Sequence, residues 1–328
     1  MSFPLITRRR FAGAATGFCG LLATPVWAQE WPAKPLRIIV PFPPGQAADT
    51  IARIIGEGLT TSLGQPVVIE NRPGAGGTLG ADLTAKAAPD GYTLGMAGNA
   101  TMSIAPSMYP NLAYAPAKDF TPVARMASVP FVFCVPADSP FKTIGQLIAA
   151  AKARPGELTY GSSGNGSTSH LALALFAEMA GIKATHVPYK GSAPSLTDLM
   201  GGRLSFSADT TAAVMPHLQS GRLRAIGVSS AKRIPFLPDV PTLDEQGVKG
   251  YDAVAWAGLV APAGTPVAVL NRLNAEIVKI TDQPAVRQRF ASLAMVPLSD
   301  TRDQFAAFLQ EDLRQWTAAV KISGAKVE

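Results

Sequence analysis

The sequence predicts an α/β protein built from two lobes. Short apolar runs rich in branched residues alternate along the chain with helical patterns, and strands that alternate with helices form parallel sheets covered on both faces. The chain has 328 residues, of which 47% are hydrophobic and 16% are charged. This composition supplies large cores and excludes a disordered protein. At roughly 150 residues per domain, the length predicts two lobes.

Residues 1–28 are typical of an export signal. Arg8-Arg9-Arg10 precede an apolar stretch over 12–26, and Val26-Trp27-Ala28 fits the small-residue rule for cleavage. The paired arginines followed one position on by Phe11 resemble a twin-arginine signal, which a receptor reads as an address. A membrane-spanning helix needs roughly 20 apolar residues, which is more than this stretch contains. We therefore expect cleavage after Ala28.

The charge balance excludes a nucleic-acid-binding protein. The formal net charge is +6, and without the three arginines of the signal 26 Lys and Arg face 23 Asp and Glu, a net +3. Nucleic-acid binding needs Lys and Arg clustered on one face, and no such cluster remains in the sequence.

Cys134 is the one cysteine outside the signal, so we expect no intrachain disulfide. The scattered His170, His186 and His217 have no ligand spacing that predicts a metal site.

The first strand-turn-helix unit covers residues 36–63. Leu36 to Phe42 is a short, branched apolar run, Pro43-Pro44-Gly45 is a turn, and 49–63 is apolar at helical spacing. The same unit recurs, so we expect parallel-rich sheets. Further strands are predicted at 66–70, 92–97, 157–160, 185–188, 204–207 and 223–228. Further helices are predicted at 79–88, 168–180, 193–200 and 211–220.

Two longer β-rich segments, 122–136 and 251–262, break this rhythm. If the two are neighbours, the chain leaves the first lobe along one and returns along the other, which predicts a two-strand hinge. The first lobe then comprises 29–130 and 256–328, and the second lobe comprises 131–255.

The C-terminal part is predicted to be helical over 266–281, 284–293 and 301–321. Thr301 and Gln304 have the pattern of a capping box. Apolar residues of the last helix recur at intervals of three and four, which predicts a core face rather than a ligand site. These residues are Phe305, Phe308, Leu309, Leu313 and Trp316.

Glycine-rich turns are the candidates for ligand binding. Pro43–Asp49 joins a strand to a helix, where glycine lets a ligand approach the free N–H groups and dipole of a helix N-terminus. A carboxylate fits such a site, although an ordinary turn with Asp49 as an N-terminal acid explains the same residues. Gly161–Thr168 offers hydroxyl and amide donors without a fixed positive charge, and a structural role explains it equally well. Gly74–Gly77 is predicted to be structural, because a helix merely begins beyond it.

The sequence gives little support for an enzyme. Neither Ser162 nor Ser163 lies in Gly-x-Ser-x-Gly, and no Walker loop or strict Gly-x-Gly-x-x-Gly is present. A serine triad assembled in space stays open as an alternative, because the order of residues along the chain does not define a triad. Its members would be Ser167, His170 or His186, and Asp209.

Six blocks of sequence carry a resemblance to a known family. The blocks are Pro35–Gly45 (PLRIIVPFPPG), Gly64–Gly77 (GQPVVIENRPGAGG), Pro89–Leu94 (PDGYTL), His186–Gly191 (HVPYKG), Leu237–Thr242 (LPDVPT) and Trp256–Pro266 (WAGLVAPAGTP). The pattern resembles the solute receptors of tripartite tricarboxylate transporters, also called Bug receptors. The resemblance covers essentially all of the mature chain.

The resemblance implies a periplasmic-binding-protein fold of the second type, with two lobes that close on a ligand, and no catalysis. It implies a monomeric periplasmic receptor that works without a cofactor and passes its ligand to membrane permease subunits. The ligands of the family are small carboxylates, including di- and tricarboxylates, aromatic acids and acidic amino acids. The implied binding residues are Phe42, Pro43, Gly45, Gln46, Ala47, Asp49, Asn99, Ala100, Ser162, Ser163, Gly164, Asn165, Gly166, Ser167 and Asp209.

Gln46 departs from the family pattern, which usually has a second glycine after Gly45. We expect the long amide either to bind the distal polar group of the ligand or to narrow the space for it. Tyr189 and Lys190 can also reach the cleft, or lie on a solvated face.

Two other functions compete with transport. One is a receptor whose closed form signals to a sensor protein, and the other is a periplasmic hydrolase that uses Ser167 and His170. A hydrolase would turn its ligand over, whereas a receptor gains stability from an unaltered ligand.

Overall fold

The structure is a computed structural model that describes residues 31–326. The predicted export signal, residues 1–28, lies outside the described residues. No helix within the described range is long and apolar enough to cross a membrane.

The first lobe contains a mixed sheet. Its strands are β1 (Leu36–Val40), β2 (Val67–Asn71), β3 (Thr93–Ala97), the first part of β4 (Phe120–Pro136), β9 (Val254–Pro262) and the short β10 (Val296–Pro297). The order across the sheet is β2-β1-β3-β9-β4, with β1 parallel to β2 and β3, and β9 antiparallel to β3 and β4. The helical segments of this lobe are α1 (Ala47–Leu63), η1 (Ala75–Gly77), α2 (Thr78–Ala85), η2 (Ala100–Ile104), α3 (Ala105–Met108), α4 (Pro116–Asp119), α9 (Val267–Thr281), α10 (Pro284–Ser292) and α11 (Arg302–Ser323).

The second lobe repeats the order of the first. Its strands are β5 (Thr159–Ser162), β6 (Thr185–Pro188), β7 (Phe206–Thr210), β8 (Leu223–Val228) and the last part of β4. The order is β6-β5-β7-β4-β8, with β5 parallel to β6 and β7, and β4 antiparallel to β7 and β8. In each lobe, one of the two hinge strands is therefore inserted antiparallel to its neighbours: β9 lies between β3 and β4 in the first lobe, and β4 lies between β7 and β8 in the second. The helices of this lobe are α5 (Ile144–Ala153), α6 (Thr168–Ala180), α7 (Ser192–Met200) and α8 (Thr211–Gln219).

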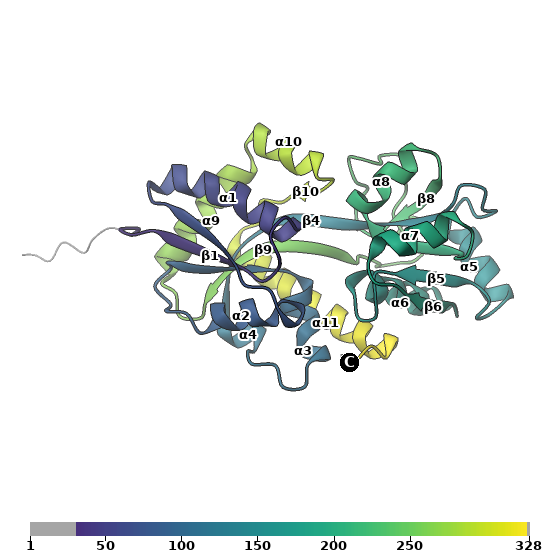
Figure 1. Ribbon diagram of the computed structural model, residues 1–328, viewed down its shortest axis with the longest axis horizontal. Helices are drawn as coiled ribbons and strands as arrows, with labels where there is room; N and C mark the ends of the chain where they lie inside the picture. Colours follow the sequence, from purple (N-terminus) through teal and green to yellow (C-terminus); the bar gives the residue numbers. More distant parts are fainter. Residues whose placement is uncertain (1–30, 327–328) are drawn as a thin grey trace, which may run out of the picture. The chain divides into compact units, whose positions relative to one another are not determined.

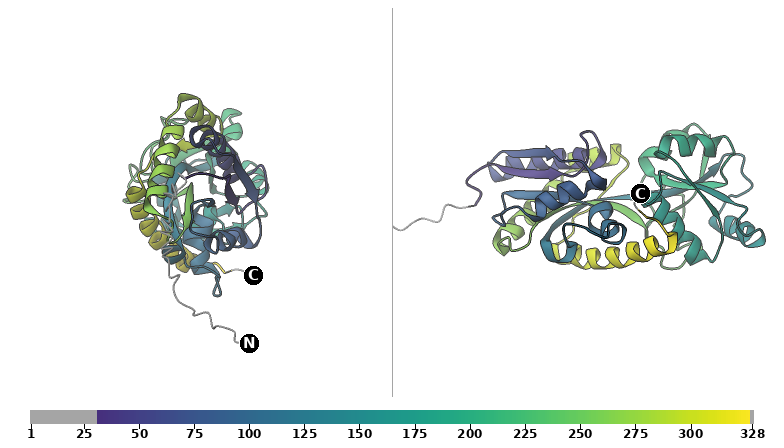
Figure 2. Two further views of the ribbon diagram at one scale, coloured as in Figure 1. Left: turned by 90° about the vertical axis from the view of Figure 1, so that its left-hand side faces the viewer. Right: turned by 60° about the horizontal axis from the view of Figure 1, so that its bottom comes forward.

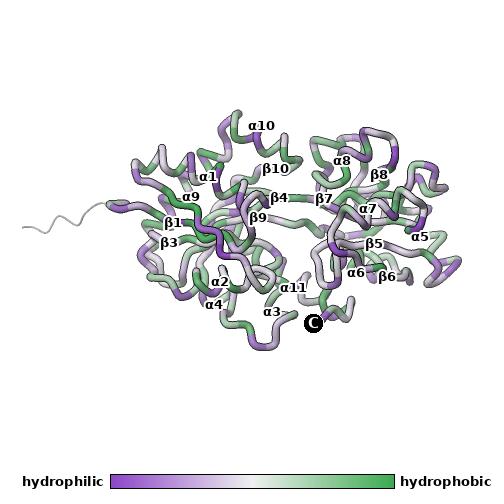
Figure 3. The backbone as a smooth tube through the Cα atoms, in the orientation of Figure 1, coloured by the Kyte–Doolittle hydropathy of each residue, from purple (hydrophilic) through white to green (hydrophobic). Residues whose placement is uncertain are grey.

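The predicted two-strand hinge is confirmed. β4 pairs with β9 from Phe120 to Pro130, and from Phe131 onward it pairs with β7 and β8 of the second lobe. Figure 1 shows β4 and β9 running side by side between the lobes, and both strands are coloured as hydrophobic in Figure 3. The lobe boundaries at 130/131 and 255/256 stay a prediction.

The helix α11 links the two lobes a third time. It packs against η2 and β4, and its far end packs against α6 of the second lobe (Figure 2, yellow). Trp316 on α11 is fully buried in one core with Phe133 and Phe176 of the second lobe and with Ile104 of the first. The predicted capping box is confirmed, because Thr301 and Gln304 exchange both of its hydrogen bonds.

The strand and helix predictions agree with the structure to within a few residues. The helix predicted at 168–180 and the strands predicted at 185–188 and 223–228 have those bounds. The helix α5 was not predicted, although Thr143 caps it by accepting a hydrogen bond from the Gln146 N–H at 3.2 Å. The segments η2 and α3, which follow β3 in the region where the two lobes meet, were not predicted either.

Candidate functional site

The second glycine-rich turn connects β5 to α6. Gly164 and Gly166 have φ angles of 138° and 70°, and this left-handed region favours glycine. Ser167 caps α6, since its Oγ accepts a hydrogen bond from the backbone N–H of His170 at 3.2 Å. The N-terminus of α6 therefore faces the turn with its favourable dipole for an anion.

Two stacked histidines support this turn from behind. The rings of His170 and His186 lie 3.8 Å apart and nearly parallel. The backbone N–H of Gly166 donates to Nδ1 of His170 at 3.1 Å, and Ser162 Oγ lies 2.7 Å from Nε2 of His186. Burial and the neighbouring His186 lower the pKa of His170 to about 4, and burial also lowers the pKa of His186. Both rings are therefore neutral at pH 7, and His170 can accept the hydrogen bond.

The geometry of these serines does not support the hydrolase. Ser167 Oγ bonds the backbone N–H of His170 rather than its ring, whose Nδ1 already accepts from Gly166. Ser162 does lie beside an imidazole, but it is 1% exposed and its hydroxyl also donates to the Gly164 carbonyl. A nucleophile needs access to its substrate as well as a base, and neither serine has both.

The first glycine-rich turn, between β1 and α1, is clamped by Asp49. Its carboxylate accepts hydrogen bonds from Gly45 N–H, Arg53 and Asn71, each at 2.9 Å. Asn71 also donates to the Phe42 carbonyl at 3.0 Å. Burial raises the pKa of Asp49, but the hydrogen bonds from Arg53, Gly45 and Asn71 outweigh burial and lower the pKa to about 2. Asp49 is thus a charged but fully engaged support of the turn.

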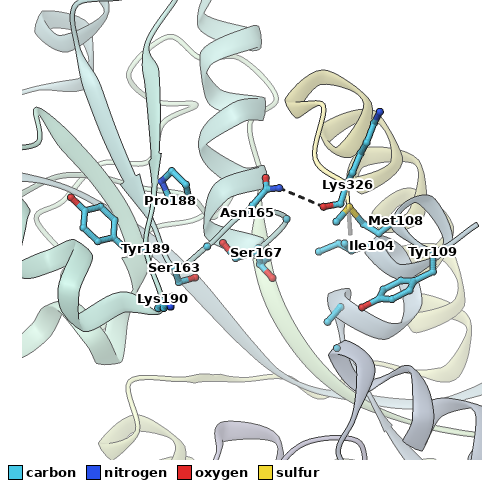
Figure 4. A pocket seen from close by; sticks show the side chains of 15 residues that line it. Ile104, Met108, Tyr109, Ser163, Asn165, Ser167, Pro188, Tyr189, Lys190 and Lys326 are labelled. Carbon is cyan, nitrogen blue, oxygen red and sulfur yellow. Dashed lines mark hydrogen bonds between the residues drawn. The ribbon is translucent and has the colours of Figure 1, made fainter. Parts of the chain in front are cut away.

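A cavity of about 600 Å³ lies between the two lobes, a size typical of small-molecule sites. Figure 4 shows Ile104, Met108 and Tyr109 of the first lobe on one side, and Ser163, Pro188, Tyr189 and Lys190 of the second lobe on the other. Asn165 and Ser167 lie between them. The remaining lining residues are Gly76, Ala100, Gly164, Gly166, Thr168 and Lys326.

The cavity contains six of the residues that the sequence implicated, most of them from the second turn. These six are Ala100, Ser163, Gly164, Asn165, Gly166 and Ser167. Tyr189 and Lys190, whose position the sequence left open, also line it.

The first turn does not line this cavity. Gly45 and Ala47 line a different cavity of about 560 Å³, together with residues of α8 and α10. Gln46 is exposed and lines neither of the two. The structure therefore does not bring the two turns into one pocket, and the role of Phe42, Pro43 and Gln46 toward a ligand stays a prediction.

Asn99 and Asp209 are buried rather than open to the cavity. Asn99 donates to the Val254 carbonyl and to Asp312, and accepts from the Trp256 N–H, so it holds β9 and α11 in place. Asp209 is 3% exposed, and burial raises its pKa. Thr210 N–H donates to one of its carboxyl oxygens at 2.7 Å.

Sequence reasoning missed the first-lobe wall of the cavity. Ile104, Met108 and Tyr109 belong to η2, α3 and the residue after α3, which carry no motif. Gly76 was assigned a structural role, yet it lines the cavity beside Tyr109: a Cβ at Gly76 would lie 2.9 Å from the tyrosine hydroxyl. A third glycine turn after a strand was the available signal for Gly76.

The electrostatics of the cavity favour an anion. Its lining residues include Lys190 and Lys326, and no Asp or Glu among those described. The hydroxyl of Tyr189 donates a hydrogen bond to Asp198 at 2.8 Å. Within residues 31–326, no group of three or more His, Cys, Asp or Glu side chains could hold a metal ion.

A family model described as the tripartite tricarboxylate transporter family receptor matches residues 51–324. The chain belongs to this family. The family consists of solute-binding receptors rather than enzymes, which confirms the prediction of a receptor without catalysis. BugT of Bordetella pertussis is 38% identical over 308 residues, covering 94% of each chain.

Solved structures of similar receptors have the same fold. The periplasmic binding protein BugD has a TM-score of 0.70 at 33% identity, covering 90% of this chain and all of its own. Rpa4515 of R. palustris, solved with adipate, has a TM-score of 0.74 at 35% identity, with 90% and 100% covered. MatC of Rhodopseudomonas palustris, with bound malate, has a TM-score of 0.69 at 35% identity, with 88% and 99% covered. The predicted two-lobe, type II fold is thereby confirmed.

Proposed function

We propose that this receptor captures a small carboxylate between its lobes in the periplasm and delivers it to the membrane subunits of a tripartite tricarboxylate-type transporter. The observation that carries the proposal is the cavity between the lobes, where the N-terminus of α6, the Ser163 and Ser167 hydroxyls and Lys190 surround a space without acidic groups. The adipate and malate bound to two similar receptors support a carboxylate.

The oxygen atoms of the ligand would bind donors of the second turn. Serine hydroxyls, the amide of Asn165 and backbone N–H groups at a helix start all donate to carboxylate oxygens. Lys190 has no ion pair with a described carboxylate, so its charge is available. A site of this kind gains charge-assisted hydrogen bonds without burying a fixed countercharge.

Closure would bring the first turn to the ligand. The proposed lobes, 29–130 with 256–328 and 131–255, are joined by β4 and β9, where a small change of backbone angles can move one lobe against the other. A ligand that contacts both turns shifts the population toward the closed form. Gln46 would then lie at the entrance, where it bonds the distal group of the ligand or narrows its space.

A thermal-shift screen of the mature chain against carboxylates tests the proposal. A bound ligand stabilises the fold by RT ln(1 + [L]/Kd), about 2.7 kcal/mol at a hundredfold excess over Kd. Recovery of the unaltered ligand distinguishes a receptor from a hydrolase. If no carboxylate raises the melting temperature, the proposed function is wrong.

A pair of lysine variants tests the site. Lys190→Gln should weaken carboxylate binding by about fivefold, an effect that shrinks at high salt. Lys232→Gln removes the same charge from an exposed position of the second lobe that does not line the cavity, so it should leave affinity unchanged. Equal affinities of both variants would place the ligand elsewhere.

The delivery step needs a separate experiment. Membrane vesicles that contain the small and large permease subunits should accumulate the ligand only when the receptor is added. Binding without any accumulation, combined with capture of a sensor protein by the ligand-bound form, would favour the signalling role.

A further inference from the structure

The two walls of the cavity between the lobes differ in chemistry. The wall from the second lobe consists mainly of small polar residues between Ser163 and Thr168, with Pro188, Tyr189 and Lys190 beside them. The wall from the first lobe consists of Ala100, Ile104, Met108 and Tyr109 with Lys326 at its edge, and Gly76 lies beside the tyrosine hydroxyl. Figure 4 shows these two groups of side chains on opposite sides of the pocket. A ligand that fills the cavity meets polar donors at one end and apolar side chains at the other.

Met108 reaches across to the polar wall. A Cβ at Gly166 would lie 2.5 Å from Met108 Cε, so the methionine side chain is in contact with the ligand-binding turn. Met108 is half-buried, and Ile104 beside it is 6% exposed. The side chains of the apolar wall are thus held in place by packing within the first lobe.

The charges in the cavity limit the charge of the ligand. The basic residues in its lining are Lys190 and Lys326, and its described lining residues include no arginine fork that could hold a second carboxylate. The carbonyl of Lys326 accepts a weak hydrogen bond from Asn165 at 3.5 Å, and Figure 4 shows its ammonium directed away from the serines. A second carboxylate placed against Ile104 and Met108 would lose hydration, and the Tyr109 hydroxyl is the one neutral donor among the described side chains of that wall.

We propose that the cavity selects a monocarboxylate with an apolar body, aliphatic or aromatic. The carboxylate binds at the turn 163–167 with Lys190, and the body packs against Ile104, Met108 and Tyr109. This proposal rests on the proposed function and names the class of ligand for the same site. Met108 is the specificity-determining residue, because its side chain forms part of the apolar wall and its methyl end contacts the polar turn at Gly166.

Hexanoate and adipate form a matched pair of probes, since they share a six-carbon chain and differ by one terminal carboxylate. Calorimetry on the mature chain should give at least a tenfold lower Kd for hexanoate than for adipate, with benzoate on the side of hexanoate and malate and citrate on the side of adipate. A methylene removed from water contributes about fourfold to affinity, so butanoate should bind more weakly than hexanoate.

The variant Met108→Gln places an amide of similar length in the apolar wall. It should weaken hexanoate binding by about fivefold to tenfold while adipate binding stays equal or improves. Met179→Gln is the matched control, because Met179 is 39% exposed on α6 and does not line the cavity. Circular dichroism and melting temperature confirm that both variants fold, and Met108→Leu should retain the preference for hexanoate.

Three results would overturn the inference. If adipate or malate binds as tightly as hexanoate, the ligand class is wrong while the carboxylate receptor stands. If hexanoate wins but Met108→Gln and Met179→Gln behave alike, the body does not lie against Met108. If no acid of the panel binds, the proposed function fails together with the inference.

Discussion

The turn after β1 and the turn after β5 occupy equivalent places in the two lobes, yet different chemistry supports them. Each follows the first strand of its lobe and precedes a helix. An ionic network of Asp49, Arg53 and Asn71 holds the first. A neutral network of hydroxyls with His170 and His186 holds the second. The first helix has no side-chain cap, whereas Ser167 caps the second.

This difference shows that one topology can divide the work of binding. The first turn keeps its support over a wide pH range, because the pKa of Asp49 is about 2. The second turn presents donors without a compensating charge behind them, and it is the turn that lines the cavity. If the second turn depends on packing and neutral hydrogen bonds and the first on a charge, variants of the two turns should respond differently to substitution and to pH.

The largest effect is expected from Gly166→Ala. Gly166 has a φ of 70°, and its new Cβ would lie 2.5 Å from Met108 Cε, so backbone strain together with displacement of the methionine end should lower the free energy of unfolding by about 2–3 kcal/mol. Gly45→Ala is the counterpart in the first turn, with a φ of 83° and nothing within 4 Å, and should cost about 1 kcal/mol. Calorimetry measures both.

A double variant sharpens this prediction. Met108→Ala opens space for the new methyl group, so Met108→Ala with Gly166→Ala should recover part of the loss in stability seen in Gly166→Ala alone. Strictly additive losses would mean that the steric contact is not the cause.

Asp49→Ala should break the first turn by removing the acceptor of Gly45, Arg53 and Asn71. We expect the free energy of unfolding to fall by about 1–3 kcal/mol in urea titrations. Glu57→Ala on the same helix is the control, since the Glu57 to Arg289 ion pair is exposed on both sides and should matter less. If Asp49→Ala were as stable as the unchanged chain, Asp49 would not be needed to hold the first turn.

Acid should weaken the second turn before the first. The pKa of His170 is about 4 in the folded chain against 6.5 in the unfolded chain. As the pH falls, the unfolded state therefore takes up a proton before the folded state does. The free energy of unfolding should decrease between pH 6.5 and 4, by up to about 1.4 kcal/mol per pH unit. Asp49 contributes stability above pH 3.8 that is lost as the pH falls toward 2. Asp312 has the opposite effect over part of this pH range. Its pKa is raised from 3.8 to about 6, so its contribution to the free energy of unfolding decreases as the pH rises from 3.8 to 6.

Urea titrations from pH 7 to 3 on the unchanged chain and on His170→Gln isolate the histidine. The glutamine at position 170 keeps an acceptor for the Gly166 N–H but cannot titrate, and His186 and Asp312 are present in both proteins. The stability difference between the two should therefore change between pH 6.5 and 4. Parallel pH profiles would contradict the assignment.

The smallest effects concern the caps. Ser167→Ala removes the cap of α6 and should cost about 1 kcal/mol of stability, whereas Gln46→Ala at the uncapped start of α1 should change stability by a few tenths. Gln46→Gly additionally tests the ligand, because an unchanged ligand profile in calorimetry would argue against a role for Gln46 at the entrance.

Much of the fold could be predicted from local patterns. Branched apolar runs gave β1, β6 and β8, and apolar spacing gave α1 and α6, because periodicity is written in consecutive residues. The hinge followed from two long β-rich segments that turned out to be paired. The helices η2 and α3 were not predicted, because they are stabilised by packing against α11 rather than by caps or by an apolar periodicity.

The candidate site was predicted in part for a related reason. Glycine and serine at Gly164, Gly166 and Ser167 mark a turn before a helix, and this turn does line the cavity. Nothing local to Met108 or Tyr109 marks a ligand wall. Their place depends on how the first lobe meets the second across the hinge.

The sequence by itself determined the order of strands and helices, the two glycine turns and the family to which the chain belongs. Only the tertiary structure decided that His170 and His186 stack behind one turn, that Asp49 is engaged behind the other, and that Met108 touches Gly166. The physical reason is that hydrogen-bonding propensity and hydrophobic period are properties of neighbours in the chain. The chemistry of a binding site comes from contacts between segments that only folding brings together.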